Sequence, residues 1–135
     1  MQKPLGKIDT IAASSRDQIP GQIPLVRART LSVTVRMVFG ASIDADATVE
    51  LYYSPDGNNW DTLTYASQAV THTAGSTVQK TFIIDPPEHG HVIVKVLNGS
   101  AADTITSVTG WYSIQSWPPW YGDSRGNIET ADVYD

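Results

Sequence analysis

Cysteine is absent from this sequence of 135 residues, so a disulfide scaffold, a thiolate zinc site and a cysteine nucleophile are all excluded. Charged residues are scarce at 17%, against 41% hydrophobic residues, and this balance argues against a disordered chain. The length is sufficient for one buried core but not for two of comparable quality. We therefore expect one globular unit.

Long hydrophobic runs are also missing. No stretch approaches the roughly 20 apolar residues that span a bilayer, so we expect no membrane partner. Residues 1–6 contain no apolar run of the kind that a signal peptide needs, so we expect synthesis in a cytoplasm. The formal net charge is -5, which repels phosphate backbones and argues against direct nucleic-acid binding.

Helical periodicity is absent as well, whereas alternation of apolar and polar residues recurs along the chain. In the clearest strand, Leu31, Val33 and Val35 share one face, while Ser32 and Thr34 lie on the other. The pattern predicts an all-β fold, an antiparallel β-sandwich or a jelly-roll-like barrel with extended N- and C-terminal arms. The six predicted strands cover residues 25–39, 48–54, 60–66, 77–84, 91–97 and 104–117.

Some segments carry a local prediction. Residues 25–39 are too many for a typical strand, so we expect a bulge or bend near Arg29 or Thr30. Residues 54–59 combine Ser, Pro, Asp, Gly and Asn, and should join the flanking strands in a β-hairpin with a loop of four to six residues. Asn-Gly-Ser at residues 98–100 matches a glycosylation sequon, which we interpret as a turn because no signal peptide is expected.

The predicted organisation is an extended N-terminal arm over residues 1–24, a β-sandwich over residues 25–117 and a C-terminal tail over residues 118–135. Prolines and glycines interrupt the first segment, and its apolar residues are isolated from one another. Composition leaves open whether this segment is a flexible extension or an arm that docks in grooves of a partner. In the second case, four isoleucines would be partner-binding anchors: Ile8, Ile11, Ile19 and Ile23.

Motifs for catalysis and metal binding are missing. There is no Gly-x-Ser-x-Gly elbow and no glycine-rich phosphate loop, so we expect no enzymatic activity, no catalytic residues and no cofactor. His89 and His91 lie two apart, which on a strand could chelate a metal, but the preceding prolines favour a solvated turn. Asp44 and Asp46 are spaced like calcium ligands, yet their loop lacks the glycine and the later glutamate of a calcium-binding hand. We therefore expect no metal site.

The run Trp-Pro-Pro-Trp-Tyr at residues 117–121 is the most unusual local feature. Three interpretations stay open: these aromatic side chains cap one end of the core, anchor a protein interface, or stack on sugar rings. The last four residues also fit the short PPxY pattern that WW domains bind. For partner binding, the candidate residues are Trp117, Trp120 and Tyr121.

Residues 49–60 contain the pattern YxSxDGxxW, formed by Tyr52, Ser54, Asp56, Gly57 and Trp60. This segment resembles a hairpin of small β-sandwich proteins encoded by tailed bacteriophages, a class that includes capsid decoration (cement) proteins. The resemblance extends over residues 30–117, although its specific part is confined to the hairpin, which also occurs in fibronectin-like and sugar-binding domains. It implies no catalytic residues.

The resemblance implies a viral structural protein, a capsid decoration protein that stabilises a phage head by bridging coat subunits. Its partners would be the major capsid protein and further copies of itself, because such proteins are typically homo-oligomers and often trimers. It would lie on the capsid surface of the virion after synthesis in the host cytoplasm. Two alternatives stay open: a carbohydrate-binding or receptor-binding β-sandwich module, and a tail-tube or head–tail connector subunit.

Overall fold

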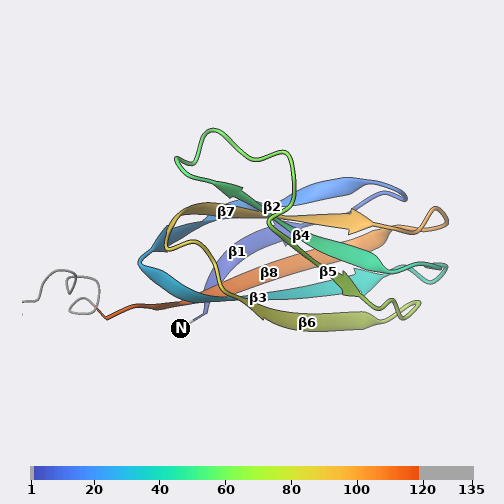
Figure 1. Ribbon diagram of the computed structural model, residues 1–135. Coiled ribbons are helices and arrows are strands. Elements are labelled where there is room, and N and C mark those ends of the chain that lie inside the picture. Colours follow the sequence, from blue (N-terminus) through green and yellow to red (C-terminus); the bar gives the residue numbers. More distant parts are fainter. Residues whose placement is uncertain (1, 119–135) are drawn as a thin grey trace, which may run out of the picture.

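The computed structural model describes residues 2–118, which form eight strands and no helix (Figure 1). All strand pairs are antiparallel, and the two four-stranded sheets have the orders β1-β8-β3-β6 and β2-β7-β4-β5. This order is that of a jelly roll, so the all-β prediction is confirmed in its jelly-roll form. The strands are β1 (Lys3–Ile8), β2 (Arg16–Val26), β3 (Ala28–Phe39), β4 (Ala47–Ser54), β5 (Ala66–Val70), β6 (Thr77–Ile84), β7 (His89–Asn98) and β8 (Ile105–Ser116).

The hydrophobic core lies between the inner faces of the two sheets. The alternation that predicted β3 places Leu31, Val33 and Val35 on the inner face, where each is fully buried. From the opposite sheet, β7 contributes Val92 and Val94 to the same cluster. Complete burial of a side chain of this size contributes about 1.5–3 kcal/mol, so these inward rows are a main source of stability.

The structure does not contain the N-terminal arm predicted over residues 1–24. This part of the chain forms β1 and β2, which are edge strands of different sheets. Prolines and glycines are tolerated in edge strands and at bulges, because one side of such a strand needs no ladder hydrogen bonds. The register shifts between Pro4 and Gly6 in β1 and between Gln18 and Gln22 in β2. The isoleucines predicted to anchor a partner lie in the protein's own core, at most 6% exposed: Ile8, Ile11, Ile19 and Ile23.

The connection between β4 and β5 is longer than predicted. β5 pairs with β4 from Leu51 opposite Ala66, so residues 55–65 form a long loop and the strand expected over residues 60–66 is absent. Apolar residues in that segment fall on both alternating rows, so no single face could be buried by forming a strand. Leu63 illustrates this, because it remains 80% exposed.

The irregularity predicted near Arg29 is confirmed. The register of β3 against β8 shifts between Ala28 and Thr30. The residue before β3, Arg27, has a φ of 51°, a left-handed conformation at the corner where the chain passes from one sheet to the other. The segment predicted as one long strand is therefore divided between the end of β2 and the whole of β3.

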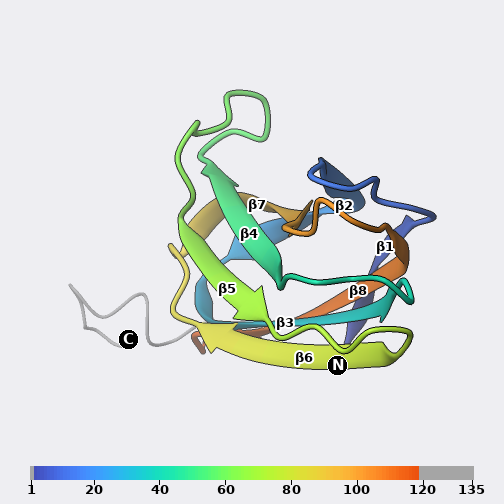
Figure 2. The ribbon, with the colours of Figure 1, turned by 90° about the vertical axis from the view of Figure 1, so that its right-hand side faces the viewer.

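The sandwich has two ends with different connections (Figure 1). The loop end carries the connections β1–β2, β3–β4, β5–β6 and β7–β8, and Figure 2 looks onto it. The terminal end carries the connections β2–β3, β4–β5 and β6–β7, together with both limits of the described chain, residues 2 and 118. Within that range there is no helix of the length and apolar character needed to cross a membrane.

Candidate functional site

Asn98 joins two connections at the loop end. Its side-chain amide donates hydrogen bonds to the carbonyl oxygens of Ile11 (3.3 Å), Ala12 (3.3 Å) and Asp103 (2.9 Å). Two N–H groups therefore serve three carbonyls, and the Oδ1 atom accepts the backbone N–H of Ser100 at 3.0 Å. Because Asn98 is only 1% exposed, the sequon at this position cannot carry a glycan in the folded protein. The residue acts as a structural clamp.

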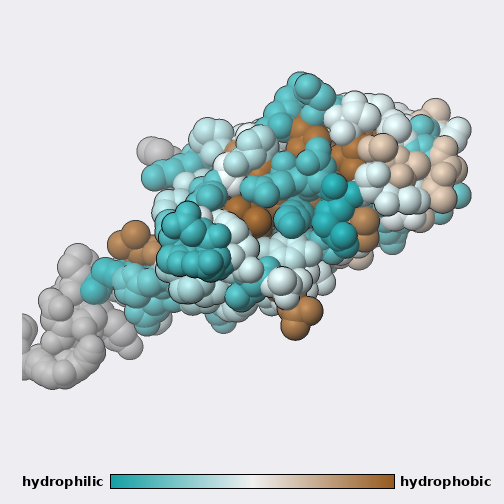
Figure 3. All heavy atoms as spheres, turned by 90° about the horizontal axis from the view of Figure 1, so that it is seen from above, coloured by the Kyte–Doolittle hydropathy of each residue, from teal (hydrophilic) through white to brown (hydrophobic). Residues whose placement is uncertain are grey.

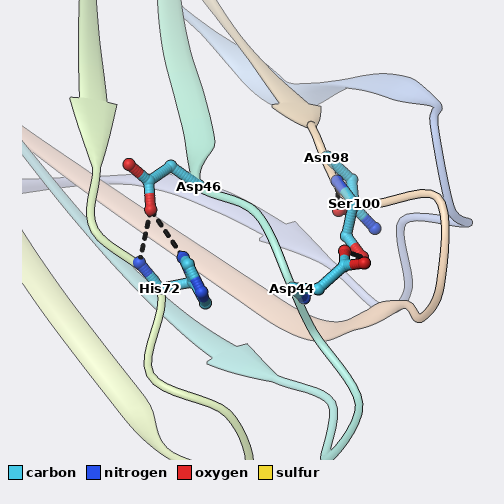
Figure 4. Close-up of polar contacts among 5 residues, drawn as sticks. All are labelled: Asp44, Asp46, His72, Asn98 and Ser100. Atoms are coloured by element: carbon cyan, nitrogen blue, oxygen red, sulfur yellow. Dashed lines mark hydrogen bonds and ion pairs between the residues drawn. The ribbon is translucent and has the colours of Figure 1, made fainter.

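Asp44 and Asp46 bind different partners, and Figure 4 shows their carboxylates directed toward separate loops. Asp44 accepts a hydrogen bond from the Ser100 hydroxyl at 2.6 Å. Asp46 lies 2.6 Å from Nδ1 of His72 and accepts the backbone N–H of His72 at 3.0 Å, and these bonds lower the pKa of Asp46. Among residues 2–118, no three histidine, aspartate or glutamate side chains are arranged to hold a metal ion. The polar groups at this end bind one another.

The YxSxDGxxW segment forms a turn held by the Asp56 carboxylate and the Ser54 hydroxyl, whose oxygen accepts the backbone N–H groups of Asp56 and Gly57. Asp56 accepts the backbone N–H groups of Asn59 and Asn58, both at 2.9 Å, and the side-chain amide of Asn59 at 2.7 Å. These hydrogen bonds hold the pKa of Asp56 far below its usual range, and the bond from the Asn59 backbone N–H has the largest effect. Gly57 has a φ of 81°, which glycine adopts without strain. The predicted turn is present, and its polar residues serve the turn itself.

His89 and His91 flank Gly90 at the start of β7. Gly90 has a φ of 116°, and a Cβ at this position would lie 2.5 Å from the hydroxyl oxygen of Tyr53. That hydroxyl donates a hydrogen bond to the carbonyl oxygen of His89 at 2.7 Å. The ring of His91 lies against Gly57 of the turn. The two histidines therefore bracket a packing contact between β4 and β7.

A charge network around the buried Glu50 lies on the outer face of the β2-β7-β4-β5 sheet. Arg16 of β2 binds both carboxylate oxygens of Glu50 of β4, at 2.6 and 3.1 Å, and this raises the pKa of the guanidinium. The Tyr52 hydroxyl donates to Glu50 at 3.3 Å, and burial followed by the nearby carboxylate raises the pKa of Tyr52. Lys95 lies 4.6 Å from the centre of the Tyr52 ring. Sequence patterns missed this network because its members come from three strands.

The terminal end carries the exposed hydrophobic side chains. Within the described part of the chain, four large hydrophobic residues are exposed, by 44% to 80% of their surface. One closes β2, two belong to the β4–β5 connection, and one precedes the β6–β7 connection. Figure 3 shows one hydrophobic group projecting at this end, on the left of the view, and another projecting midway along the lower edge. We call these residues the terminal-end apolar set: Val26, Leu63, Tyr65 and Ile83.

The alternation of apolar and polar residues contains one signal for this set. Ile83 occupies the row of β6 that otherwise carries Thr77, Gln79 and Thr81, so it is an apolar residue on a polar face. Leu63 gave no signal, because a loop residue does not belong to an alternating row in which an apolar residue would stand out.

The β4–β5 and β6–β7 connections are joined by a hydrogen bond. The Tyr65 hydroxyl donates to the carbonyl oxygen of Asp85 at 2.7 Å.

A groove of about 500 Å³ beside Trp117 opens at the same end. The guanidinium of Arg29 lies 5.1 Å from the centre of the Trp117 ring, a cation–π distance, and Asp85 and Glu88 contribute to the lining. The groove therefore combines an aromatic surface with charges of both signs. Of the three aromatic candidates, only Trp117 falls in the described range, and Trp120 and Tyr121 lie outside it.

No family model and no curated protein matches the chain. Several solved structures do. The mitogen derived from Yersinia pseudotuberculosis is 15% identical, with a TM-score of 0.51 over 87% of this chain and 89% of that chain. The K1 cleaved adhesin domain of Lys-gingipain from Porphyromonas gingivalis W83 is 15% identical, with a TM-score of 0.51 over 73% of this chain and 61% of that chain.

A chain of infectious bursal disease virus, Gx strain, is also similar in structure. It is 12% identical, with a TM-score of 0.50 over 87% of this chain, which spans only 33% of the viral chain. At these identities the likeness concerns the fold. The β-sandwich of this chain is thus one that a virus chain, a mitogen and an adhesin domain also contain.

Proposed function

We propose that this chain is a non-catalytic structural protein of a virus particle, a capsid decoration protein that stabilises a phage head by bridging coat subunits. The observation that carries this proposal is the position of the terminal-end apolar set, because each of its four residues lies in a connection of the terminal end or within two residues of one. The polar groups of the loop end bind one another instead. One-sided exposure of hydrophobic side chains is typical of a protein-binding surface.

The fold and the sequence agree with this role. A sandwich similar in fold is part of a chain of infectious bursal disease virus, so the architecture is compatible with a virus particle. The YxSxDGxxW turn supports the resemblance to phage sandwich proteins, and the Asp56 carboxylate is engaged by Asn59 within the turn. A protein with this role needs a folded body and a surface that binds coat subunits, and we propose the terminal-end apolar set as that surface.

The proposed mechanism is physical. Burying one large apolar side chain in an interface contributes about 1.5–3 kcal/mol, so a few residues of the set supply a useful contact. Copies bound at neighbouring positions of a particle would add avidity without requiring one large interface. The loop end would then face solvent, as its internally bonded polar side chains allow.

The test is binding to coat particles that lack the protein. Leu63→Asp and Ile83→Asp each place a charge in the proposed interface, while Thr73→Asp places the same charge on an exposed residue of the loop end. We expect at least a tenfold loss of affinity, about 1.4 kcal/mol, for the first two variants and none for the third. Equal binding by all three variants, with unchanged circular dichroism, would refute the proposal.

The groove beside Trp117 favours a second candidate function, binding of a carbohydrate or a glycan receptor. An aromatic ring next to carboxylates can stack on a sugar and accept its hydroxyl hydrogen bonds. A glycan array separates the two functions, because Trp117→Ala should abolish carbohydrate binding while Leu63→Asp leaves it intact. If the protein binds no glycan on the array but does bind coat particles, carbohydrate binding is rejected and the capsid decoration role is retained.

A further inference from the structure

A cleft of about 320 Å³ opens at the terminal end between the edge strands β1 and β2. Most of its lining is apolar, and Lys3 adds a positive charge. This cleft is separate from the groove beside Trp117, since the two share no lining residue. Its lining consists of Lys3, Pro24, Val26, Tyr112, Ile114 and Ser116.

The cleft lies beside an open backbone edge. β1 begins at Lys3, opposite Tyr112, whereas β8 continues to Ser116. Residues 113–116 are paired with β3 on one side, and within residues 2–118 no strand pairs with them on the other. An extended peptide can add to such an edge as a further strand, while its side chains enter the adjacent pocket.

We propose that this cleft and the open edge of β8 bind residues 119–135 of a second copy of the chain, so that copies associate by exchanging C-terminal segments. The charges are complementary, because the segment has four acidic residues and one arginine, and the cleft has Lys3. Its Ile128 and Val133 supply apolar side chains for the apolar lining. An extended segment of this length spans roughly 55 Å, enough to reach a neighbouring sandwich.

The exit of the chain favours a neighbouring copy over the same copy. Trp117 and Pro118 each precede a proline, which restricts both residues to extended conformations. Ser116 already lines the cleft, so residues 119–135 could enter the cleft of their own copy only after the chain had reversed its direction. A segment that leaves in an extended direction needs no such reversal to reach a neighbour. This inference goes beyond the proposed function, because it names the segment through which copies meet.

The absence of native cysteine permits a direct test in the full-length protein. A chain carrying Ser116→Cys is mixed with a chain carrying Val133→Cys under mild oxidation. We expect a covalent dimer that contains one chain of each kind. The matched control replaces the first partner with Thr73→Cys, an exposed position at the loop end, and should give at least tenfold less dimer.

Charge reversal tests the role of the cleft lysine. Lys3→Glu should lower the yield of the mixed dimer at least tenfold, whereas Lys7→Glu, the same change at an exposed position of the same strand, should leave it unchanged. The proposal is overturned if Thr73→Cys crosslinks as well as Ser116→Cys, or if Lys3→Glu and Lys7→Glu behave alike. It is also overturned if a chain with both cysteines forms only an internal disulfide. Because the crosslinking experiment contains no coat particle, a negative result in it does not affect the separate test of binding to coat particles.

Discussion

Replacing Asn98 with aspartate should destabilise the protein strongly, although the two side chains have almost the same size and shape. The change alters a single group, the amide nitrogen that donates hydrogen bonds to the carbonyl oxygens of Ile11, Ala12 and Asp103. A carboxylate at this place has no proton to donate and would face three carbonyl oxygens. The residue is 1% exposed, so water cannot take over as a partner.

The expected loss follows from these contacts. A hydrogen bond contributes about 1 kcal/mol net, so three lost bonds account for about 3 kcal/mol. Leaving a buried charge beside unpaired acceptors adds to this, and we expect a total of about 3–5 kcal/mol at pH 7. Since domains of this kind are stable by only 5–15 kcal/mol, the variant should be near its unfolding threshold at moderate temperature.

The loss should also depend on pH. The fold disfavours the ionised form of the new carboxyl, so its pKa is raised above the unfolded value. The loss of stability in Asn98→Asp is therefore smallest below about pH 4, which is the pKa of aspartate in the unfolded chain, and it grows as the pH rises. Urea unfolding of Asn98→Asp and of the exposed control Asn58→Asp, at pH 3 and pH 7, measures both effects. A deficit within about 0.5 kcal/mol of the control, or one independent of pH, would refute the clamp.

Two further predictions concern the histidine contact and a glycine. Asp46 contributes stability through His72 that is fully present above the ordinary aspartate pKa of about 3.9 and is lost as the pH falls through its lowered value. Asp46→Asn should therefore unfold at lower urea than the wild type at pH 7, and a difference in urea midpoint that does not narrow as the pH falls through the lowered pKa of Asp46 would contradict this. Gly90→Ala should lower the free energy of unfolding by about 2–3 kcal/mol, as measured by thermal unfolding. The new Cβ would lie 2.5 Å from the Tyr53 hydroxyl oxygen, and alanine would also have to adopt a φ that is unfavourable for it. Gly75→Ala, with a φ of 70° and its nearest atom at 3.9 Å, should cost only about 1 kcal/mol, and equal losses would exclude the packing effect.

Alternation along the sequence predicted the strands that bury one face. β3 and β6 follow the predicted rows closely, because each has an inner apolar face and an outer polar one. The strands of the N-terminal segment escaped prediction because Pro4, Pro20 and Pro24 are turn formers in most sequences. Their edge position, which makes prolines acceptable, is known only once both sheets are assembled.

The candidate binding surfaces were predictable only in part. Trp117 was selected as an unusual aromatic residue, and it lines a groove at the terminal end. The Arg16–Glu50 pair joins residues 34 positions apart, and the Asn98 clamp depends on the meeting of two loops. Such contacts arise from tertiary structure, so no local spacing indicates them. Leu63 became notable only when the structure showed that nothing buries it.

The prolines that hid β1 and β2 in the sequence also protect the folded protein from aggregation. An open sheet edge offers backbone groups to any passing strand, and proline and bulges interrupt that template. On the opposite flank, Lys80 of the edge strand β6 lies opposite the buried Val35, in the row that otherwise faces inward. A charge in that row discourages a second sheet from docking there. Crowded copies of this chain should thus resist pairing along their flanks, which leaves the terminal end as the proposed surface of contact.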